Sequence, residues 1–208
     1  MSCYEKLSVL TNIFIAIGTI SSVFTAVYLE KIKSCIFKTK LSIEILDYKG
    51  ELTQWANGSR VYYYHIVFKN LKPGRTIRKC SVFLKKIQKL NANGEFIDLP
   101  ITVPPRFIWA PSETSPEAID IISEQVLDFG VIEEPIKDVV ISKFYPVVTK
   151  QFFDFKGNTC KNETLRYHLD IISENYKQKK LTIIEVTWNG KWSENTVEMM
   201  NNLKIRKI

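Results

Sequence analysis

The longest apolar run in the chain lies near its N-terminus, from Leu7 to Leu29, and contains no charged side chain. A helix of that length rises about 34 Å, enough to cross a bilayer hydrocarbon core of roughly 30 Å. A cleaved signal peptide has a shorter apolar region and small residues before its cleavage site, whereas Tyr28 and Leu29 end this run. A helix lying in the membrane interface needs a charged face, which this run lacks. The pattern therefore predicts a transmembrane helix.

The charges that flank this run predict its orientation. A lone Lys6 precedes it, whereas four lysines follow it, namely Lys31, Lys33, Lys38 and Lys40. Because an excess of lysine marks the cytoplasmic side, the N-terminus is expected outside and the rest of the chain inside the cell. The sequence thus predicts a single-pass protein of the cell inner membrane, divided into a short N-terminal tail (1–6), a transmembrane helix (7–29), a basic juxtamembrane linker (30–40) and a cytosolic domain (41–208).

Small side chains recur within the apolar run. Gly18, Ser22 and Ala26 follow one another at intervals of four residues, so a helix places them in one stripe. Such stripes allow the backbones of two membrane helices to approach closely. This spacing indicates a possible helix-association stripe and a homo-oligomer, although small residues are also common in membrane helices that do not associate.

The rest of the chain alternates apolar and polar residues, as strands do. It is rich in Ile, Val, Tyr, Phe and Trp, which favour strands. A shift in the alternation near Lys85 and Lys86 indicates a β-bulge. A short helix is expected from Glu194 to Asn202, with Ser193 as its N-cap. Strands are predicted at residues 41–48, 61–70, 77–90, 95–99, 106–110, 125–132, 137–148, 164–172, 181–188 and 203–208.

Many short strands and one late helix predict a mainly β domain, a sandwich or small barrel. Two consecutive strands, 61–70 and 77–90, form the clearest predicted pair, with Lys72-Pro73-Gly74 as the turn between them. This pair resembles the second-to-third-strand hairpin of immunoglobulin-like sandwiches. The resemblance rests on Phe68-x-Asn70, the Pro-Gly turn, and the alternating Ile77, Cys80, Val82 and Leu84.

The Tyr63-Tyr64-His65 strand and the closing segment from Trp188 to Trp192 resemble an uncharacterised group of prokaryotic β-sandwich proteins. That group carries no assigned activity. The resemblance therefore implies an immunoglobulin-like β-sandwich behind a single N-terminal transmembrane helix, and it implies no function.

Charge is distributed unevenly along the predicted domain. A basic stretch without acids covers the first strand pair, and an acidic stretch without bases lies between Arg106 and Lys137. The two stretches either neutralise each other as neighbours or leave a surface for an anionic lipid or a nucleotide. The basic residues that would form such a patch are Lys69, Lys72, Arg75, Arg78, Lys79, Lys85 and Lys86.

Residues that could carry catalysis are few. His65 and His168 each follow a tyrosine within a predicted strand, where a histidine is usually bonded to a neighbour, although the two could face each other across a sheet. The four cysteines form no Cys-x-x-Cys pair or Cys/His cluster, which argues against a zinc site. The sequence also lacks a nucleophile elbow, a phosphate-binding loop and an HExxH motif. We therefore expect no enzymatic activity, no cofactor and no metal.

Two functions remain consistent with these observations. The first is a membrane-anchored, non-enzymatic binding module that faces the cytosol and presents loops and edges to a protein partner. The alternative is a sensor-effector, as in some prokaryotic antiviral systems, in which a ligand or partner clusters the chains through Gly18, Ser22 and Ala26.

Overall fold

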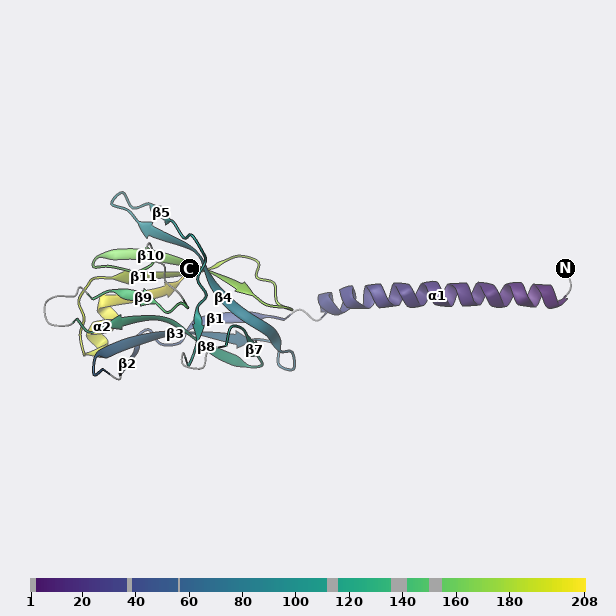
Figure 1. The fold of residues 1–208 in the computed structure, drawn as a ribbon, viewed down its shortest axis with the longest axis horizontal. Coiled ribbons are helices and arrows are strands. Elements are labelled where there is room, and N and C mark those ends of the chain that lie inside the picture. The colour runs from purple at the N-terminus through teal and green to yellow at the C-terminus, as the bar shows by residue number, and fades with distance from the viewer. Residues whose placement is uncertain (1–2, 37–38, 56, 112–115, 136–141, 150–154) are drawn as a thin grey trace. The chain divides into compact units, whose positions relative to one another are not determined.

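The computed structural model describes residues 3–36, 39–55, 57–111, 116–135, 142–149 and 155–208. These residues divide into two compact units, residues 1–38 and residues 39–208. The first unit is the helix α1, Cys3–Ile36, and the second, which we call the β unit, contains two β-sheets and a short helix (Figure 1). Each unit is described by itself.

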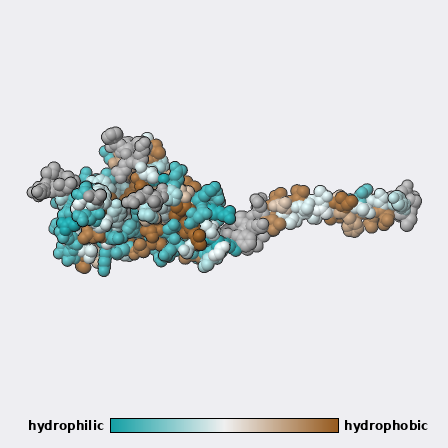
Figure 2. Space-filling model, turned by 60° about the horizontal axis from the view of Figure 1, so that its bottom comes forward, coloured by the Kyte–Doolittle hydropathy of each residue, from teal (hydrophilic) through white to brown (hydrophobic). Residues whose placement is uncertain are grey.

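Helix α1 contains a segment, Leu7–Leu29, that is long and apolar enough to span a membrane. Its mean hydropathy is 1.9 and none of it is buried within the structure. Hydrophobic residues recur along α1 in the space-filling view, whereas hydrophilic residues cover much of the visible face of the β unit (Figure 2). An exposed apolar helix of this kind is unstable in water, so it needs an apolar environment.

Four hydroxyl groups of α1 are compatible with such an environment, because the helix itself satisfies them. The Thr11, Thr19 and Thr25 hydroxyls donate to main-chain carbonyls one turn earlier, at 2.7–2.9 Å. The Ser22 hydroxyl donates likewise to the carbonyl of Thr19 at 2.8 Å. A polar group satisfied within its own helix avoids the cost of an unpaired donor in hydrocarbon.

Helix α1 differs from the sequence expectation at its C-terminal end. The helix continues past Leu29 to Ile36, so most of the predicted linker at 30–40 is helical. Gly18, Ser22 and Ala26 are exposed along the helix. Their role in helix association stays a prediction.

The first sheet is built around β3 and β8, which pair antiparallel along nearly their whole lengths. Strands β1 and β2 pair with the edge of β3 that is opposite β8, and β6 and β9 pair with the edge of β8 that is opposite β3. The bounds are β1 Leu41–Ile45, β2 Glu51–Gln54, β3 Arg60–Asn70, β6 Ile108–Trp109, β8 Glu124–Glu133 and β9 Phe144–Pro146.

The second sheet has the order β12-β11-β10-β4-β5, with β7 also pairing with β4. All its strand pairs are antiparallel. The bounds are β4 Ile77–Leu90, β5 Phe96–Leu99, β7 Ile119–Ile121, β10 Glu163–Ile172, β11 Thr182–Trp188 and β12 Leu203–Lys207. The prediction of a mainly β domain is therefore confirmed.

One hydrophobic core joins the two sheets. Phe129 of β8 meets Tyr167 of β10 edge to face, with ring centres 5.7 Å apart, and Phe144 of β9 also contacts both rings. Alternation along β3 places Tyr62, Tyr64, Ile66 and Phe68 in this core. Burying a large apolar side chain contributes about 1.5–3 kcal/mol, so these aromatics account for much of the cohesion between the sheets.

The predicted hairpin of strands 61–70 and 77–90 is wrong in its pairing. Both strands exist as β3 and β4, but β3 belongs to the first sheet and β4 to the second. The turn between them therefore crosses from one sheet to the other. The predicted bulge is confirmed, because the β10–β4 register shifts where Lys85 is inserted between Leu84 and Lys86. Strands β2 and β7 were not predicted, and part of predicted strand 137–148 lies outside the described residues.

Helix α2, Thr196–Asn202, begins two residues later than predicted. Its N-cap is Asn195, whose side-chain oxygen accepts from the main-chain N–H groups of Val197 and Glu198. Ser193, the predicted cap, instead accepts from the Asn195 N–H at 3.1 Å and donates to the Glu198 carboxylate at 2.7 Å. The polar residues of the loop thus share the capping of one helix end.

Candidate functional site

The structure separates the predicted basic patch into groups. Lys72, Arg75, Arg78 and Lys79 lie in or beside the turn between β3 and β4. Lys85 and Lys86 lie farther along β4, about 20 Å away at roughly 3.3 Å per residue. Lys69 lies in β3 of the other sheet. The turn therefore holds the densest part of the predicted patch.

Three of these basic side chains contact carboxylates. Lys69 Nζ lies 2.7 Å from Glu44 Oε2, Lys79 Nζ 2.5 Å from Glu174 Oε1, and Lys86 Nζ 2.9 Å from Asp98 Oδ1. The hydrogen bonds to these carboxylates raise the pKa values of Lys69 and Lys79 above their usual range.

The acidic stretch of the sequence lies beside the basic one. Glu124 is opposite Lys69 in the β3–β8 register, and Asp120 Oδ1 accepts from the main-chain N–H of Lys79 at 2.8 Å. Neighbouring strands thus bring opposite charges together, which favours partial neutralisation over a uniformly basic surface.

The last residue of β3, Asn70, ties two turns together. Its side chain is 8% exposed, and its Nδ2 donates to the carbonyls of Ile121, Ile122 and Arg75. Its Oδ1 accepts from the main-chain N–H of Lys72 at 3.0 Å. Asn70 therefore fastens the β3–β4 turn to the β7–β8 turn through main-chain groups of both.

A second asparagine, Asn175, ties the β10–β11 turn to the same place. Its Nδ2 donates to the Thr76 carbonyl at 2.8 Å, and its Oδ1 accepts from the Arg78 N–H at 2.9 Å. Its own carbonyl accepts from the Thr39 hydroxyl at 2.7 Å. The Leu71 N–H donates to the Lys40 carbonyl at 2.8 Å. We call this assembly of residues 39–40, 71–76, 122–123 and 173–181 the Thr39 end.

The surface of the Thr39 end combines apolar and basic side chains. Ile122 is 71% exposed and Leu71 is 46% exposed. They border an open groove of about 590 Å³ that is also lined by Lys69, Asn70, Pro73, Gly74, Ser123 and Glu124. Large aliphatic side chains at turn tips lie in contact with water unless something covers them.

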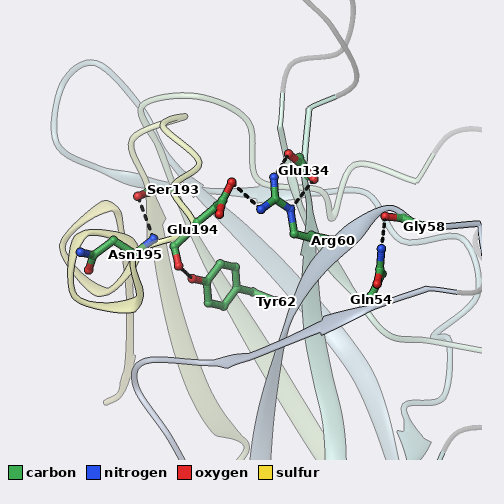
Figure 3. A network of polar contacts seen from close by, with 8 residues as sticks. All are labelled: Gln54, Gly58, Arg60, Tyr62, Glu134, Ser193, Glu194 and Asn195. Atoms are coloured by element: carbon green, nitrogen blue, oxygen red, sulfur yellow. Dashed lines mark hydrogen bonds and ion pairs between the residues drawn. The ribbon is translucent and has the colours of Figure 1, made fainter.

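The other end of β3 is organised by Arg60 (Figure 3). Its guanidinium binds Glu134 in a bidentate pair, Nε to Oε2 at 2.9 Å and Nη2 to Oε1 at 2.6 Å, and also pairs with Glu194. It lies 5.3 Å from the ring centre of Trp192. The Tyr62 hydroxyl donates to the Glu194 carbonyl at 2.9 Å. We call Arg60, Glu134 and residues 192–195 the Arg60 end.

The charges of the Arg60 end depend on one another. Hydrogen bonds from Arg60 hold the pKa of Glu134 below its usual range. No sequence motif marks this network. Glu134 and Glu194 lie far from Arg60 along the chain, so no local pattern indicates the contact. The one available signal is a charged residue at the first position of a strongly patterned strand.

The two histidines lie in different sheets, so the prediction that they could face each other across one sheet is wrong. His65 Nδ1 lies 3.0 Å from Oδ1 of the buried Asp128, and this carboxylate raises the pKa of the imidazole. His168 Nε2 lies 2.8 Å from Gln88 Oε1, and burial lowers the pKa of its ring. Both settings match strand histidines bonded to neighbours.

The thiols and potential metal ligands give no chemical centre in the described part of the chain. Burial raises the pKa of Cys80 to about 12, and burial also raises that of Cys160. A thiol with a raised pKa is protonated at neutral pH and is a weak nucleophile. Among the described residues, no group of three His, Cys, Asp or Glu side chains is arranged to hold a metal ion.

Compared with known proteins, the sequence matches no protein family model, no curated protein and no solved structure.

Proposed function

We propose that this chain is a single-pass, membrane-anchored binding module without catalytic activity, with its β unit in the cytoplasm. The observation that carries the proposal is α1, whose Leu7–Leu29 segment is apolar and exposed throughout, with threonine and serine hydroxyls bonded back to its own carbonyls. Such a helix is suited to lipid and unsuited to water. The lysines after the segment favour a cytoplasmic β unit.

The β unit, we infer, is an immunoglobulin-like sandwich. The order β1-β3-β8-β6 corresponds to the A-B-E-D sheet of that fold, and the neighbours β4-β10-β11 correspond to C-F-G. Passage of the chain from β3 in one sheet to β4 in the other corresponds to the step from B to C. Sandwiches of this architecture present loops at their two ends, which is support by analogy for a binding role.

The settings of the chemically active side chains support binding over catalysis. His65 lies beside the Asp128 carboxylate, His168 is hydrogen bonded to the Gln88 amide, and Cys80 is buried. The Arg60 end, by contrast, combines arginine with tryptophan, and the buried Tyr62 ring packs against Trp192 from the core. Arginine and tryptophan are enriched at energetically dominant positions of protein interfaces. We therefore assign the protein partner to the Arg60 end.

Charge placed in the middle of α1 tests the anchor. The double variant Ile17→Lys, Val23→Lys should release the chain from membranes, because a lysine at the centre of a membrane helix costs about 2.5–3.5 kcal/mol on insertion scales. The matched control Ile97→Lys, Val197→Lys places the same charges at exposed apolar positions of the β unit. The measurement is the share of protein that remains in the membrane pellet after salt and alkaline washing.

The parent and the control should stay in the pellet, and the α1 variant should leave it. Extraction of the parent by the alkaline wash would refute the anchor. Reporter fusions after Ile208 complete the experiment, since a reporter that is active only in the cytoplasm should be active there. Activity of a reporter that requires export would refute the proposed orientation.

A further inference from the structure

The Thr39 end, we propose, is a lipid-binding face that rests on the anionic surface of the membrane in which α1 is anchored. The inference rests on the proposed function, because it requires the anchor. It adds a second membrane contact, made by the β unit itself. It also assigns a chemical class of ligand, the phosphate headgroups of anionic lipids, to part of the predicted basic patch.

Covalent geometry keeps the Thr39 end near the bilayer. Helical residues 30–36 rise about 10 Å beyond the apolar segment, and the three peptide steps from Ile36 to Thr39 reach at most about 11 Å. Thr39 is therefore within about 20 Å of the end of the apolar segment. Thr39 is itself hydrogen bonded to the β10–β11 turn, so that turn shares the restriction.

Charge complementarity favours an anionic surface. Basic residues occur on three of the four chain segments that form the Thr39 end, at 39–40, 71–76 and 173–181, whereas segment 122–123 carries none and Glu174 is paired with Lys79. A basic cluster next to a membrane segment is attracted to anionic lipid. The basic residues concerned are Lys40, Lys72, Arg75, Arg78, Lys177, Lys179 and Lys180.

The exposed aliphatic side chains favour a bilayer over a soluble anion. Ile122 and Leu71 lie at turn tips beside the basic residues, which suits a surface whose headgroup layer adjoins hydrocarbon. The groove beside them carries Glu124, whose carboxylate would repel a nucleotide phosphate. A broad surface with scattered basic residues tolerates one such carboxylate, whereas a small phosphate pocket does not.

The face is already ordered before any lipid binds. Asn70 and Asn175 hold the three turns and the chain entry at residues 39–40 in one arrangement. A preordered surface loses little conformational entropy on binding, so modest electrostatic attraction is enough to dock it.

The experiment compares amide hydrogen exchange of the full chain in two kinds of nanodisc. One kind contains phosphatidylcholine alone, and the other contains phosphatidylcholine with phosphatidylglycerol. In the anionic nanodiscs, exchange at residues 71–76, 122–123 and 173–181 should slow by about tenfold, as a few basic residues near an anionic surface would give. Exchange in the central strands should be the same in both lipids.

Charge reversal distinguishes this face from general attraction. The triple variant Lys177→Glu, Lys179→Glu, Lys180→Glu should abolish the lipid-dependent protection. The matched control Lys161→Glu, Lys191→Glu, Lys204→Glu changes net charge equally at exposed positions outside the Thr39 end and should retain the protection. Equal exchange in the two lipids, or equal behaviour of the two triple variants, would overturn the proposal.

Two further outcomes are informative. If inorganic phosphate protects the same residues in neutral nanodiscs, the face binds a soluble anion and the lipid assignment is refuted. If the parent chain does not enter nanodiscs at all, the anchor and this inference both fall. A parent that is incorporated but shows no lipid-dependent protection refutes this inference and leaves the anchor standing.

Discussion

The two ends of strand β3 are tied to the rest of the β unit by different chemistry. At its last residue, Asn70, a neutral and buried amide binds main-chain groups of two turns. At its first residue, Arg60, a guanidinium that is 35% exposed binds the carboxylates of Glu134 and Glu194. We call a side chain that binds several chain segments in this way a hub. Strand β3 thus has an uncharged hub, Asn70, at one end and a charged hub, Arg60, at the other.

This difference in chemistry predicts how the stability of each end responds to substitution and to pH. Deleting a buried amide leaves several main-chain groups without partners, each at a cost of about 1–3 kcal/mol. Ion pairs near the surface are screened by water and contribute about 0–1 kcal/mol each. The Thr39 end should therefore be sensitive to loss of its hub side chain and insensitive to pH, whereas the Arg60 end should show the reverse.

The largest expected effect is that of Asn70→Ala. The substitution leaves the carbonyls of Ile121 and Ile122 and the N–H of Lys72 without the Asn70 side chain, so the free energy of unfolding should fall by about 2–4 kcal/mol. Chemical denaturation of the full chain in detergent micelles measures this loss. The control Asn93→Ala, at an exposed turn, should change stability by less than about 0.5 kcal/mol. Equal losses for the two variants would contradict the role of Asn70 as a hub.

A smaller loss of stability than for Asn70→Ala is expected for Arg60→Met, which removes the carboxylate pairs but keeps an unbranched apolar chain. Its effect should be local, because Arg60 holds the loop that contains Trp192 and Glu194. Amide exchange at residues 189–195 should accelerate more than exchange in the central strands. Arg60→Lys keeps the charge without the bidentate geometry and should fall between parent and Arg60→Met. Uniform acceleration of amide exchange throughout the β unit would argue against a local effect of Arg60 on this loop.

The smallest effect is a difference in pH dependence. Glu134 has a lowered pKa in the folded protein, so its pairing contributes stability above its ordinary value of 4.5 and loses it as the pH falls through the folded pKa. The stability gap between the parent and Arg60→Met should therefore narrow as the pH is lowered below about 4.5. The gap between the parent and Asn70→Ala should stay constant across the same titration. If both stability differences narrowed in the same way, the proposed distinction between Arg60 and Asn70 would be refuted.

Sequence patterns predicted the long strands and missed two short ones, β2 and β7. In β3, Tyr62, Tyr64, Ile66 and Phe68 are buried in the core and Tyr63 and His65 between them are partly exposed, which produces a readable period of two. Strand β2 is exposed at all four positions, and β7 has only three residues, so neither carries a usable period. The strand pair 164–172 and 181–188 was predictable from its short connection and is present as β10 and β11. Partners separated by long segments were not predictable, because such strands meet only through the packing of the whole core.

The candidate sites show the same limit. His65 and His168 both follow a tyrosine and precede an aliphatic residue, yet their pKa values shift in opposite directions. The carboxylate of Asp128 on the neighbouring strand raises the pKa of His65, whereas burial and then the charge of Lys86 lower the pKa of His168. Asn70 was noted in the sequence, but its function as a hub depends on main-chain groups of a turn that only the fold brings near.

The pairing of β4 with β10 also has a kinetic consequence. The whole of segment 91–162 lies between these strands, so their contact closes a long loop, and sheets with such pairings fold in about milliseconds to seconds. Helix α1 makes local contacts and can form in about a microsecond. Unpaired strands must therefore persist long after the helix exists. The charged side chains of Lys85, at the bulge of β4, and of Arg166, in β10, lie away from the core. Such charges discourage strands that are still unpaired from pairing with another chain.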